Sequence, residues 1–221
     1  MPEKRTAIGL FGGTFNPVHL GHLHAATKVA EAFGLDRVLF IPSYIPPHKS
    51  TAEVAPAEDR FRMVELACRE SARFRACDIE VRAREKSYSI LTVGRIAEVF
   101  PGARLFFILG IDAFLEIGTW FDYEQLLEKV RFIVTDRPGY DLAGVVTVLD
   151  GSLRGRTAPV IEDGRAAGEL NGECRVFPIR IGPLAVSSTD IRNRARRGEG
   201  LDGLVPPAVS DYIMENKLYS I

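Results

Sequence analysis

Two histidines, His19 and His22, stand three positions apart at a turn that follows the first apolar run of the chain, residues 7–11. Small residues at positions 12–14 lead into this turn, and Gly21 lies between the histidines. The free N–H groups and the positive dipole at the start of a helix favour anions, and a glycine lets a phosphate approach the backbone closely. The spacing predicts a phosphate site with two imidazoles beside it.

The same histidines could instead hold a metal ion. All four histidines of the chain lie within its first 50 residues, at His19, His22, His24 and His48. Against a metal site, His24 should point away from His22 on a helix, and no cysteine or carboxylate stands close in sequence. The glycines of this region fit neither a GxGxxG dinucleotide fingerprint nor a P-loop.

Two further segments place polar groups at turns. Lys49 follows two prolines and His48, which would hold its ammonium group in place at a low entropic cost. The alternative is a rigid proline turn that presents a surface lysine. Tyr88 and Ser89 open a predicted helix, whose N–H groups and hydroxyl would suit a carboxylate, and a plain helix cap is the alternative.

Polar and aromatic residues also follow a later apolar run, residues 104–109. Gly110 and Asp112 come at its end, where a carboxylate can accept a hydrogen bond from a ribose hydroxyl. Trp120 is the only tryptophan of the chain, and it could either stack on an aromatic ring of a ligand or pack in the core.

A helix start is predicted near Ser188 and Thr189, which supply two hydroxyls. Arg192 lies one turn further on, where its guanidinium fork could bind phosphate oxygens. The alternative is an ordinary capped helix with a solvated arginine.

The segment GGTFNPVHLGH, residues 12–22, resembles the HxGH signature of the nucleotidyltransferase superfamily, and its long form is similar to that of bacterial nicotinate mononucleotide adenylyltransferases. Four more segments resemble elements of this family: IPSYIPPHK at 41–49, SYS at 87–89, FILGID to TWF at 107–121, and VSSTDIR at 186–192. Ser89 stands where the family more often has Thr, and Phe121 where it usually has Tyr. The further motifs of the cytidylyltransferases, which share HxGH, are not recognised.

The resemblance implies a role for each matching residue. The residues that it assigns to catalysis are His19, His22, Lys49 and Arg192. It assigns to ATP binding Gly12, Gly13, Thr14, Phe15, Gly21, Gly110, Asp112, Ser188 and Thr189. It assigns to nicotinate mononucleotide binding Tyr88, Ser89, Trp120, Phe121 and Arg137. No residue is assigned to a protein-held metal.

The implied reaction joins ATP and nicotinate mononucleotide to give deamido-NAD and pyrophosphate, a step of NAD biosynthesis. The mononucleotide phosphate attacks the α-phosphorus of ATP in line, without a covalent enzyme intermediate. Mg²⁺ would arrive with ATP, and no tightly bound organic cofactor is implied. Nicotinamide mononucleotide or phosphopantetheine as the acceptor, and a metal-binding or nucleotide-sensing module without catalysis, are the alternatives.

The elements that must position these residues alternate between apolar runs and amphipathic stretches. We expect strands at residues 7–11, 37–42, 104–109, 131–135 and 176–181, with a shorter strand at Ile79 and Val81. We expect helices at 21–33, 57–71, 89–100, 123–129 and 189–197, and a last one opened by Pro206 and Pro207.

Apolar strands bracketed by helices indicate an α/β fold, a single Rossmann-like doubly wound parallel sheet with helices on both faces and a small C-terminal helical segment. Ligands should bind at the carboxyl ends of its strands. We expect one nucleotidyltransferase domain over residues 1–221. Residues 151–174 are rich in glycine and charge without periodicity, and we expect them to form a mobile surface insertion.

Composition limits the remaining choices. The 221 residues carry 28 basic against 29 acidic side chains, a net charge of −1 that argues against a nucleic-acid binder. No apolar run approaches the roughly 20 residues that a membrane span needs. Three cysteines without a CxxC pair and an amino terminus without an apolar leader predict a cytoplasmic protein. Small-molecule substrates are the expected partners, and a homo-oligomer is left open.

Nearly all of the positive charge is arginine, since lysine occurs only at Lys4, Lys28, Lys49, Lys86, Lys129 and Lys217. A phosphate-handling surface built on guanidinium forks would explain such a skew. Codon bias is the simpler interpretation, and we adopt it for all arginines except Arg192 and Arg137.

Overall fold

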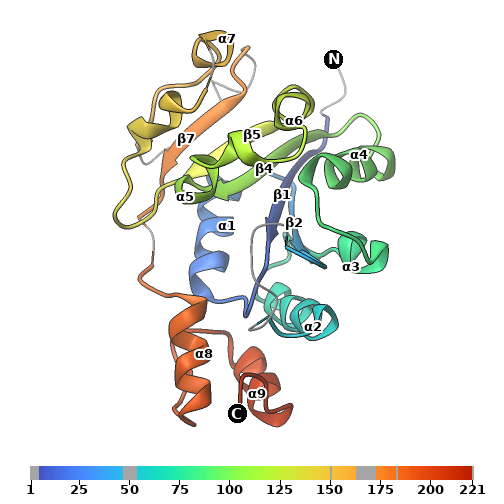
Figure 1. Cartoon of the computed structure of the whole chain (residues 1–221), viewed down its shortest axis with the longest axis vertical. Coiled ribbons are helices and arrows are strands. Elements are labelled where there is room, and N and C mark those ends of the chain that lie inside the picture. The colour runs from blue at the N-terminus through green and yellow to red at the C-terminus, as the bar shows by residue number, and fades with distance from the viewer. Residues whose placement is uncertain (1–4, 47–53, 150, 163–172, 183, 221) are drawn as a thin grey trace. The chain divides into compact units, whose positions relative to one another are not determined.

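The computed structural model describes residues 5–46, 54–149, 151–162, 173–182 and 184–220, and Figure 1 shows its ribbon. Its strands are β1 Ala7–Gly13, β2 Arg37–Pro42, β3 Phe74–Ala76, β4 Arg104–Gly110, β5 Arg131–Thr135, β6 Ile161–Glu162 and β7 Val176–Arg180. They form one sheet in the order β3-β2-β1-β4-β5-β7-β6. The pairs β1–β4, β4–β5, β5–β7 and β6–β7 are parallel. The predicted doubly wound α/β sheet is confirmed.

The helices follow the strands in alternation. The α-helices are α1 Leu20–Phe33, α2 Ala57–Ala67, α3 Ile79–Ala83, α4 Ser89–Val99, α5 Ile111–Phe114, α6 Tyr123–Lys129, α7 Gly151–Arg154, α8 Ser188–Arg196 and α9 Pro207–Glu215. Short 3₁₀ turns lie at Cys68–Glu70, Ile117–Thr119 and Leu142–Thr147. No helix of the described residues is long and apolar enough to cross a membrane.

The chain divides into two compact units. Unit 1 comprises Met1–Gly12, Ala25–Val38 and Tyr88–Pro183, and unit 2 comprises Gly13–His24, Leu39–Ser87 and Leu184–Ile221. The single domain expected from the sequence stays a prediction.

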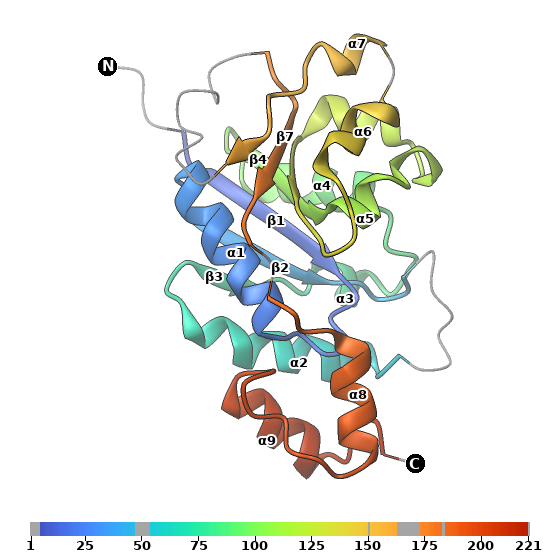
Figure 2. The ribbon, with the colours of Figure 1, turned by 90° about the vertical axis from the view of Figure 1, so that its left-hand side faces the viewer.

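The core of unit 1 is built on both faces of the central strands because side chains alternate along a strand. Phe106 of β4 faces Phe33 of α1, with ring centroids 6.2 Å apart. The next residue, Phe107, contacts Phe132 of β5 on the other side, at 5.6 Å. Figure 2 shows α1 on one face of these strands and α4, α5 and α6 on the opposite face. Each buried phenylalanine contributes about 1.5–3 kcal/mol.

Unit 2 has its own core. Met63 and Val64 of α2 are fully buried, as are Val209 and Ile213 of α9. The hydroxyl of Tyr212 on α9 donates to Asp59 on α2 at 2.7 Å, which joins the two helices by a polar contact as well.

One predicted element is wrong. Ile79 and Val81 belong to helix α3, not to a strand, and the short strand of this region is β3, a few residues earlier. Two apolar residues at i and i+2 fit either element when the segment has only five residues. The N–H of Arg82 bonds to the carbonyl of Asp78 at 2.8 Å, and their side chains also pair, so the i,i+4 contacts favour the helix.

The segment expected to be a mobile insertion, residues 151–174, contains α7 and β6. Residues 163–172 lie outside the described part of the chain. The mobility of the segment stays a prediction. The other boundaries agree closely, and the strands expected at 37–42 and 131–135 are found at those bounds.

Candidate active site

The turn after β1, residues 14–22, brings the two predicted histidines together in unit 2, and we call it the histidine turn. The imidazole rings of His19 and His22 stack with centroids 3.7 Å apart and an interplanar angle of 30°. His19 is buried, and His22 is only half-buried. The ring of Phe15 packs edge-on against His22 at 5.0 Å. His22 is therefore the more accessible imidazole, and Phe15 supports it from behind.

A backbone contact fixes the tautomer of His22. The N–H of His19 donates to Nδ1 of His22 at 3.2 Å. Because a backbone N–H can only donate, Nδ1 must be the acceptor, and the proton of the neutral ring lies on Nε2. An N–H at Nε2 is the kind of donor that suits a phosphate oxygen.

Gly21 is required by packing within the turn. A Cβ at this position would lie 3.0 Å from Nδ1 of His19, 3.1 Å from its Cε1, and 3.7 Å from the carbonyl oxygen of Val186. Contacts near 3 Å are tighter than real Cβ atoms normally make, so a side chain here would displace the buried imidazole. The glycine keeps His19 in place, in addition to any role in admitting a phosphate.

The start of α1 offers fewer open N–H groups than a free helix end would. The N–H of Leu20 donates to Leu204 at 2.9 Å, and those of His22 and Leu23 donate to the carbonyl of His19 at 2.9 and 3.3 Å. Within the described residues, the N–H of Gly21 is the one of the first four that these bonds leave for an anion. At this helix start, the backbone N–H that could bind an anion is therefore that of Gly21, the residue between the two histidines.

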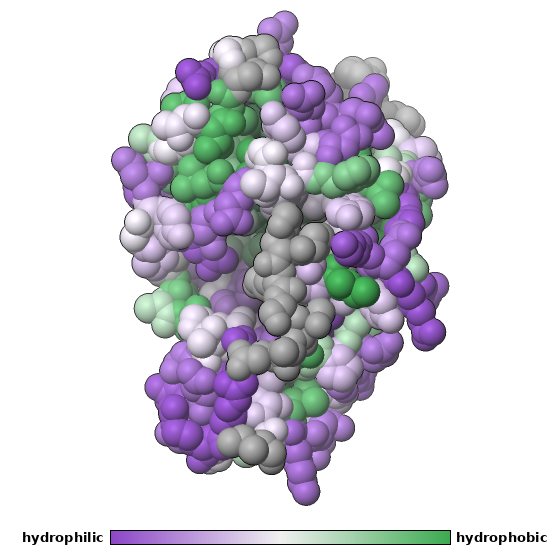
Figure 3. All heavy atoms as spheres, in the orientation of Figure 1, coloured by the Kyte–Doolittle hydropathy of each residue, from purple (hydrophilic) through white to green (hydrophobic). Residues whose placement is uncertain are grey.

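Helix α8 begins against the histidine turn. Ser187 caps the helix, because its side chain accepts from the N–H of Asp190 at 3.1 Å. The hydroxyl of Ser188 donates to the carbonyl of Pro17 at 3.0 Å. These contacts bring a second helix start to the turn, and the ATP-binding role of Ser188 stays a prediction. Figure 3 shows that the surface over α8, at the lower left, is strongly hydrophilic.

Arg192 joins the same helix to the turn by its guanidinium group. One Nη donates to the carbonyl of Asn16 at 2.9 Å, and the other donates to the hydroxyl of Thr189 at 3.3 Å. Its Nε has no hydrogen-bond partner among the described residues. Part of the fork therefore orients the side chain, and Thr189, which is exposed, keeps its own hydroxyl proton to donate.

Asn16 is a contact point that the sequence analysis did not identify. Its side-chain oxygen accepts from the N–H of Ala55 and from the hydroxyl of Tyr219, both at 3.0 Å. The Asn16–Pro17 peptide bond is cis. Burial raises the pKa of Tyr219, so its phenol stays protonated and remains a donor at neutral pH.

Arg60 is a second residue that the sequence analysis missed. Its side chain is 1% exposed, and its guanidinium donates to three carbonyl oxygens: Thr14 at 2.8 Å, Ala55 at 2.9 Å and Tyr44 at 3.1 Å. It ties the histidine turn to the segments that follow β2 and precede α2. Burial lowers the pKa of Arg60, but an arginine keeps its charge at neutral pH.

A signal for Arg60 was present in the sequence. The buried face of α2 includes Met63, Val64 and Ala67. Arg60 falls three and four positions before the first two, which continues the same helical stripe. A charged residue on an apolar stripe indicates a buried cation with dedicated acceptors.

The residues predicted to bind the mononucleotide lie in unit 1. Tyr88 is the N-cap residue of α4, but its side chain makes no capping hydrogen bond, and Ser89 is the first helical residue. The plain helix-cap alternative therefore finds no support in the side-chain contacts. Both residues are half-buried, so they are accessible from solvent.

Tyr88, Trp120 and Phe121 form a set of accessible rings that we call the aromatic surface. The rings of Tyr88 and Phe121 lie 4.8 Å apart at 39°, and the Phe121 side chain is 58% exposed. Trp120 is half-buried and packs edge-on against Phe107 at 6.0 Å. Trp120 therefore packs partly against the core, as one of the two interpretations of this residue expected, and part of its side chain remains exposed. The exposed ring of Phe121 is available to stack on a planar ligand.

Asp112 and Arg137 meet at the carboxyl ends of β4 and β5. Their side chains form an ion pair of 3.5 Å, and both are partly exposed. A Cβ on Gly110 would collide with the carboxylate of Asp112 and lie 2.7 Å from Nε of Arg137. Gly110 is therefore needed for the pair to form, and the pair places a carboxylate and a guanidinium together where the sequence assigned them separate substrates.

Three predicted residues remain. Gly12 and Gly13 leave room for aromatic rings, because a Cβ on each would lie 3.3 Å from Phe107 and 3.2 Å from Phe15, respectively. Lys49 lies outside the described residues, so its role stays a prediction. Among the described residues, no three His, Cys, Asp or Glu side chains are grouped so as to hold a metal.

Comparison with known proteins gives one family. A model of the family described as "Cytidylyltransferase-like" matches residues 10–194. Two bacterial relatives carry the name "Probable nicotinate-nucleotide adenylyltransferase". The one from Geobacter sulfurreducens is 40% identical over 96% of this chain and 97% of its own length. The one from Pelobacter propionicus is 42% identical over 96% and 98%.

A solved structure has a similar fold. It is Plasmodium falciparum nicotinic acid mononucleotide adenylyltransferase complexed with NaAD, with a TM-score of 0.71 at 18% identity over 97% of this chain and 98% of its own. At this identity the likeness concerns the fold alone.

Proposed function

The chain belongs to the nicotinate-nucleotide adenylyltransferase family, and on that premise we propose that it transfers the adenylyl group of ATP to nicotinate mononucleotide, forming deamido-NAD and releasing pyrophosphate. The observation that carries the proposal is the histidine turn, in which two stacked imidazoles lie at the start of helix α1. The reaction is a step of NAD biosynthesis.

The chemistry asks for positioning more than for activation. A phosphate monoester is already anionic at pH 7, so an oxygen of the mononucleotide can attack the α-phosphorus directly. The new bond joins that oxygen to the α-phosphorus, and the bond from the α-phosphorus to the bridging oxygen breaks, so that pyrophosphate leaves with the electron pair. The protein has to align the two phosphates and neutralise the charge that develops.

His22 is the group that would face the α-phosphate, since its Nε2 is the protonated nitrogen. His19 would act beside it, in a position that is possible because Gly21 has no Cβ to displace the His19 ring. Arg192 and Thr189 would contact the departing phosphates through the parts of their side chains that the turn does not use. Lys49 would add a further cation on the leaving group, and Ser188, Gly12, Gly13, Thr14 and Phe15 would form the rest of the ATP site.

A divalent cation accompanies the nucleotide in enzymes of this kind, and we propose Mg²⁺ bound to ATP. Such an ion keeps several waters and takes most other ligands from phosphates. The described residues group no three carboxylate, histidine or cysteine side chains, a donor set that suits an ion held mainly by its nucleotide.

The aromatic surface of unit 1 would take the nicotinate ring. Tyr88, Trp120 and Phe121 present accessible rings, and the start of α4 beside Ser89 offers N–H groups to the ring carboxylate. A carboxylate distinguishes nicotinate from nicotinamide, which fits a helix N-terminus that favours anions. Asp112 would accept from a ribose hydroxyl of ATP, and Arg137, through its ion pair with Asp112, would contact the mononucleotide. The cytoplasmic location and a homo-oligomeric state stay predictions.

The test is release of pyrophosphate from ATP with three acceptors measured side by side: nicotinate mononucleotide, nicotinamide mononucleotide and phosphopantetheine. We expect nicotinate mononucleotide to give the highest kcat/KM. A higher value for phosphopantetheine would overturn the proposed acceptor, and turnover with nicotinamide mononucleotide equal to that with nicotinate mononucleotide would overturn the role given to the start of α4.

A further inference from the structure

A pocket of about 640 Å³ in unit 1 is lined mainly by basic side chains. Six of its residues are basic and one is acidic: Arg5, Arg104, Lys129, Arg131, Arg156 and Arg175, with Glu173. We call it the arginine pocket. Ala103 and Leu105 complete its wall. The predicted reaction uses none of these residues.

The parallel sheet brings these residues together. Arg5 precedes β1 by two positions, Arg104 and Arg131 are the first residues of β4 and β5, and Arg175 directly precedes β7. These four strands are neighbours in the sheet, and Arg104 pairs with Ala7 while Arg131 pairs with Phe106. Parallel neighbours start at the same edge, so the pocket lies at the amino ends of the strands.

This edge is separate from the residues at the carboxyl ends of β4 and β5 that are proposed to bind ATP and the mononucleotide. Gly110 is the last residue of β4 and Asp112 follows it, whereas Arg104 is the first residue of the strand. A strand of seven residues spans about 20 Å at 3.3 Å per residue. A ligand in the arginine pocket would therefore not contact the Asp112–Arg137 pair.

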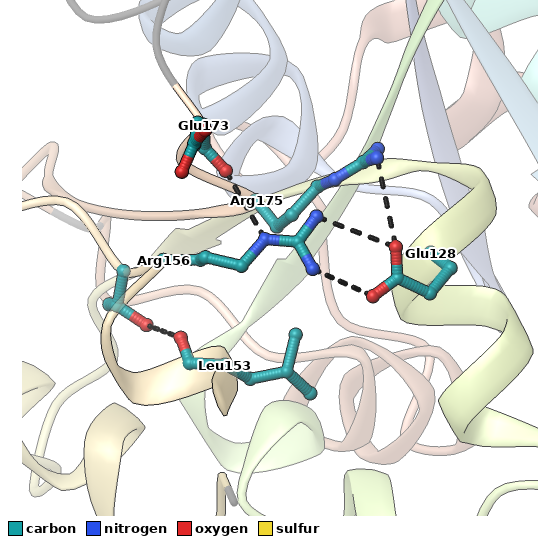
Figure 4. A network of polar contacts seen from close by, with 6 residues as sticks. Glu128, Leu153, Arg156, Glu173 and Arg175 are labelled. Atoms are coloured by element: carbon teal, nitrogen blue, oxygen red, sulfur yellow. Dashed lines mark hydrogen bonds and ion pairs between the residues drawn. The ribbon is translucent and has the colours of Figure 1, made fainter. Parts of the chain in front are cut away.

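Two of the arginines are held by an acidic residue. Figure 4 shows the guanidinium groups of Arg156 and Arg175 directed at the carboxylate of Glu128. Arg156 contacts its two oxygens at 2.7 and 3.4 Å, and Arg175 lies 3.7 Å from one of them. The Nε of Arg156 also donates to the carbonyl of Glu173 at 3.4 Å. One carboxylate thus fixes two cations and neutralises only one charge.

Among the described residues, no carboxylate neutralises Arg104 or Arg131 in this way. Arg104 has an Nε without a hydrogen-bond partner among the described residues, and neither it nor Arg131 pairs with a described carboxylate. Burial, and the nearby charges of Arg175 and Arg104, lower the pKa of Arg131. Half-buried guanidinium groups that repel one another are stable only if something offsets their charge, and an anion in the pocket would do so.

We propose that the arginine pocket is a second binding site, for a small molecule that carries two or more linked phosphates. Guanidinium forks match phosphate oxygens in geometry and charge, and several of them converge on one space. The volume lies within the range of pockets that hold small ligands. An excess of basic over acidic residues of six to two, with Glu128 included, favours a multiply charged anion over a single carboxylate.

The probe is inorganic tripolyphosphate, whose binding is measured by titration calorimetry at about 0.1 M salt. The wild-type chain is titrated alone and after saturation with deamido-NAD, which would fill the proposed active site. This second titration rests on the proposed function. We expect tripolyphosphate to bind in both states. Failure of deamido-NAD to bind would count against the proposed function, whereas failure of tripolyphosphate to bind the saturated protein would overturn the second site.

The variants are Arg131→Gln and Lys129→Gln. The control is Arg62→Gln, which removes one positive charge from an exposed side chain of α2 in unit 2. We expect Arg131→Gln to weaken tripolyphosphate binding at least 10-fold, since a lost hydrogen bond to a charged group has about that effect. If Arg131→Gln does not fold, Lys129→Gln replaces it, because Lys129 is exposed. We expect Lys129→Gln to weaken tripolyphosphate binding about 3-fold. Affinities equal to that of Arg62→Gln would overturn the proposal.

Competition then distinguishes the sources of the phosphates. Displacement of tripolyphosphate by ADP from the deamido-NAD-saturated protein would identify a nucleotide ligand, and displacement only by pyrophosphate and longer chains would identify a free polyphosphate. Both results support the site. Binding of an oligonucleotide without any binding of tripolyphosphate would refute a small-molecule site.

Discussion

Replacement of Arg60 by methionine tests the claim that a buried cation holds the histidine turn. Methionine keeps an unbranched stem of similar length and removes all the donors. The carbonyl oxygens of Thr14, Ala55 and Tyr44 would then lose partners at 2.8–3.1 Å in a place where Arg60 is 1% exposed. Each buried acceptor left unpaired has a free-energy penalty of about 1–3 kcal/mol.

The net effect on unfolding is smaller than the sum of these penalties. Removing the guanidinium also removes the cost of burying its charge, which the lowered pKa of Arg60 reflects. Breaking a buried charged network by deleting one member typically destabilises by about 3–5 kcal/mol. At about 2–4 °C per kcal/mol for a protein of this size, the midpoint of thermal unfolding should fall by roughly 6–20 °C.

The matched control is Arg62→Met on the same helix. Arg62 pairs with Glu65 at 3.2 Å, and both side chains are more than 40% exposed, so this variant should stay within about 0.5 kcal/mol of the wild type. Arg60→Lys provides the second comparison, because it keeps the charge but loses the planar fork. It should fall between the wild type and Arg60→Met, and raise KM for ATP more than KM for the mononucleotide.

The stability and the kinetics of the Arg60 variants can each contradict the role given to Arg60. Urea unfolding gives the free energy, and initial rates give the two KM values. If Arg60→Met unfolded with a free energy within 0.5 kcal/mol of Arg62→Met, the three carbonyl bonds would not hold the turn. If Arg60→Lys behaved as the wild type in both assays, the charge alone would suffice and the fork geometry would be irrelevant.

Three further predictions concern the site and the pH dependence. His22→Ala should lower kcat by about 10²–10³ with little change in the unfolding midpoint, as loss of one charge-stabilising donor does, and wild-type turnover would exclude His22 from catalysis. Trp120→Ala should raise KM for the mononucleotide more than for ATP, whereas equal changes in initial-rate assays would leave it a structural residue. Burial raises the pKa of Tyr219, and burial with its bond to Asp59 raises that of Tyr212 to about 12. The unfolded chain therefore releases these protons first, so the free energy of unfolding should fall as pH rises above 10, less steeply in Tyr219→Phe; an unchanged slope in urea titrations would contradict this.

The strands of the sheet were predictable because each one is marked by a pattern within its own short segment of sequence. Residues 37–42 and 131–135 are short apolar runs between charged residues and turn formers, and they fold as strands at those bounds. The strand expected at Ile79 and Val81 failed because two residues carry too little periodicity, and the pairing of Arg82 with Asp78 favours a helix there.

The site was predictable only where its residues share one segment. The histidine turn lies within a single motif, whereas the bond from Ser188 to Pro17 joins residues 171 positions apart, and only the resemblance related them. Arg60 has no motif, and its role depends on carbonyl groups whose positions the sequence does not specify. The Asp112–Arg137 pair likewise depends on the register of β4 and β5.

Part of the arginine excess follows a positional pattern, which is a separate matter from the number of arginines that codon bias would account for. Arginine directly precedes or opens the apolar strands β2, β4, β5 and β7, at Arg37, Arg104, Arg131 and Arg175. Codon bias would raise the number of arginines without fixing their phase relative to strand starts. A strand start is also where a parallel sheet gathers residues that are far apart in sequence. The positions of Arg104, Arg131 and Arg175, which line the arginine pocket, therefore support the proposed anion site at this edge more than the number of arginines does.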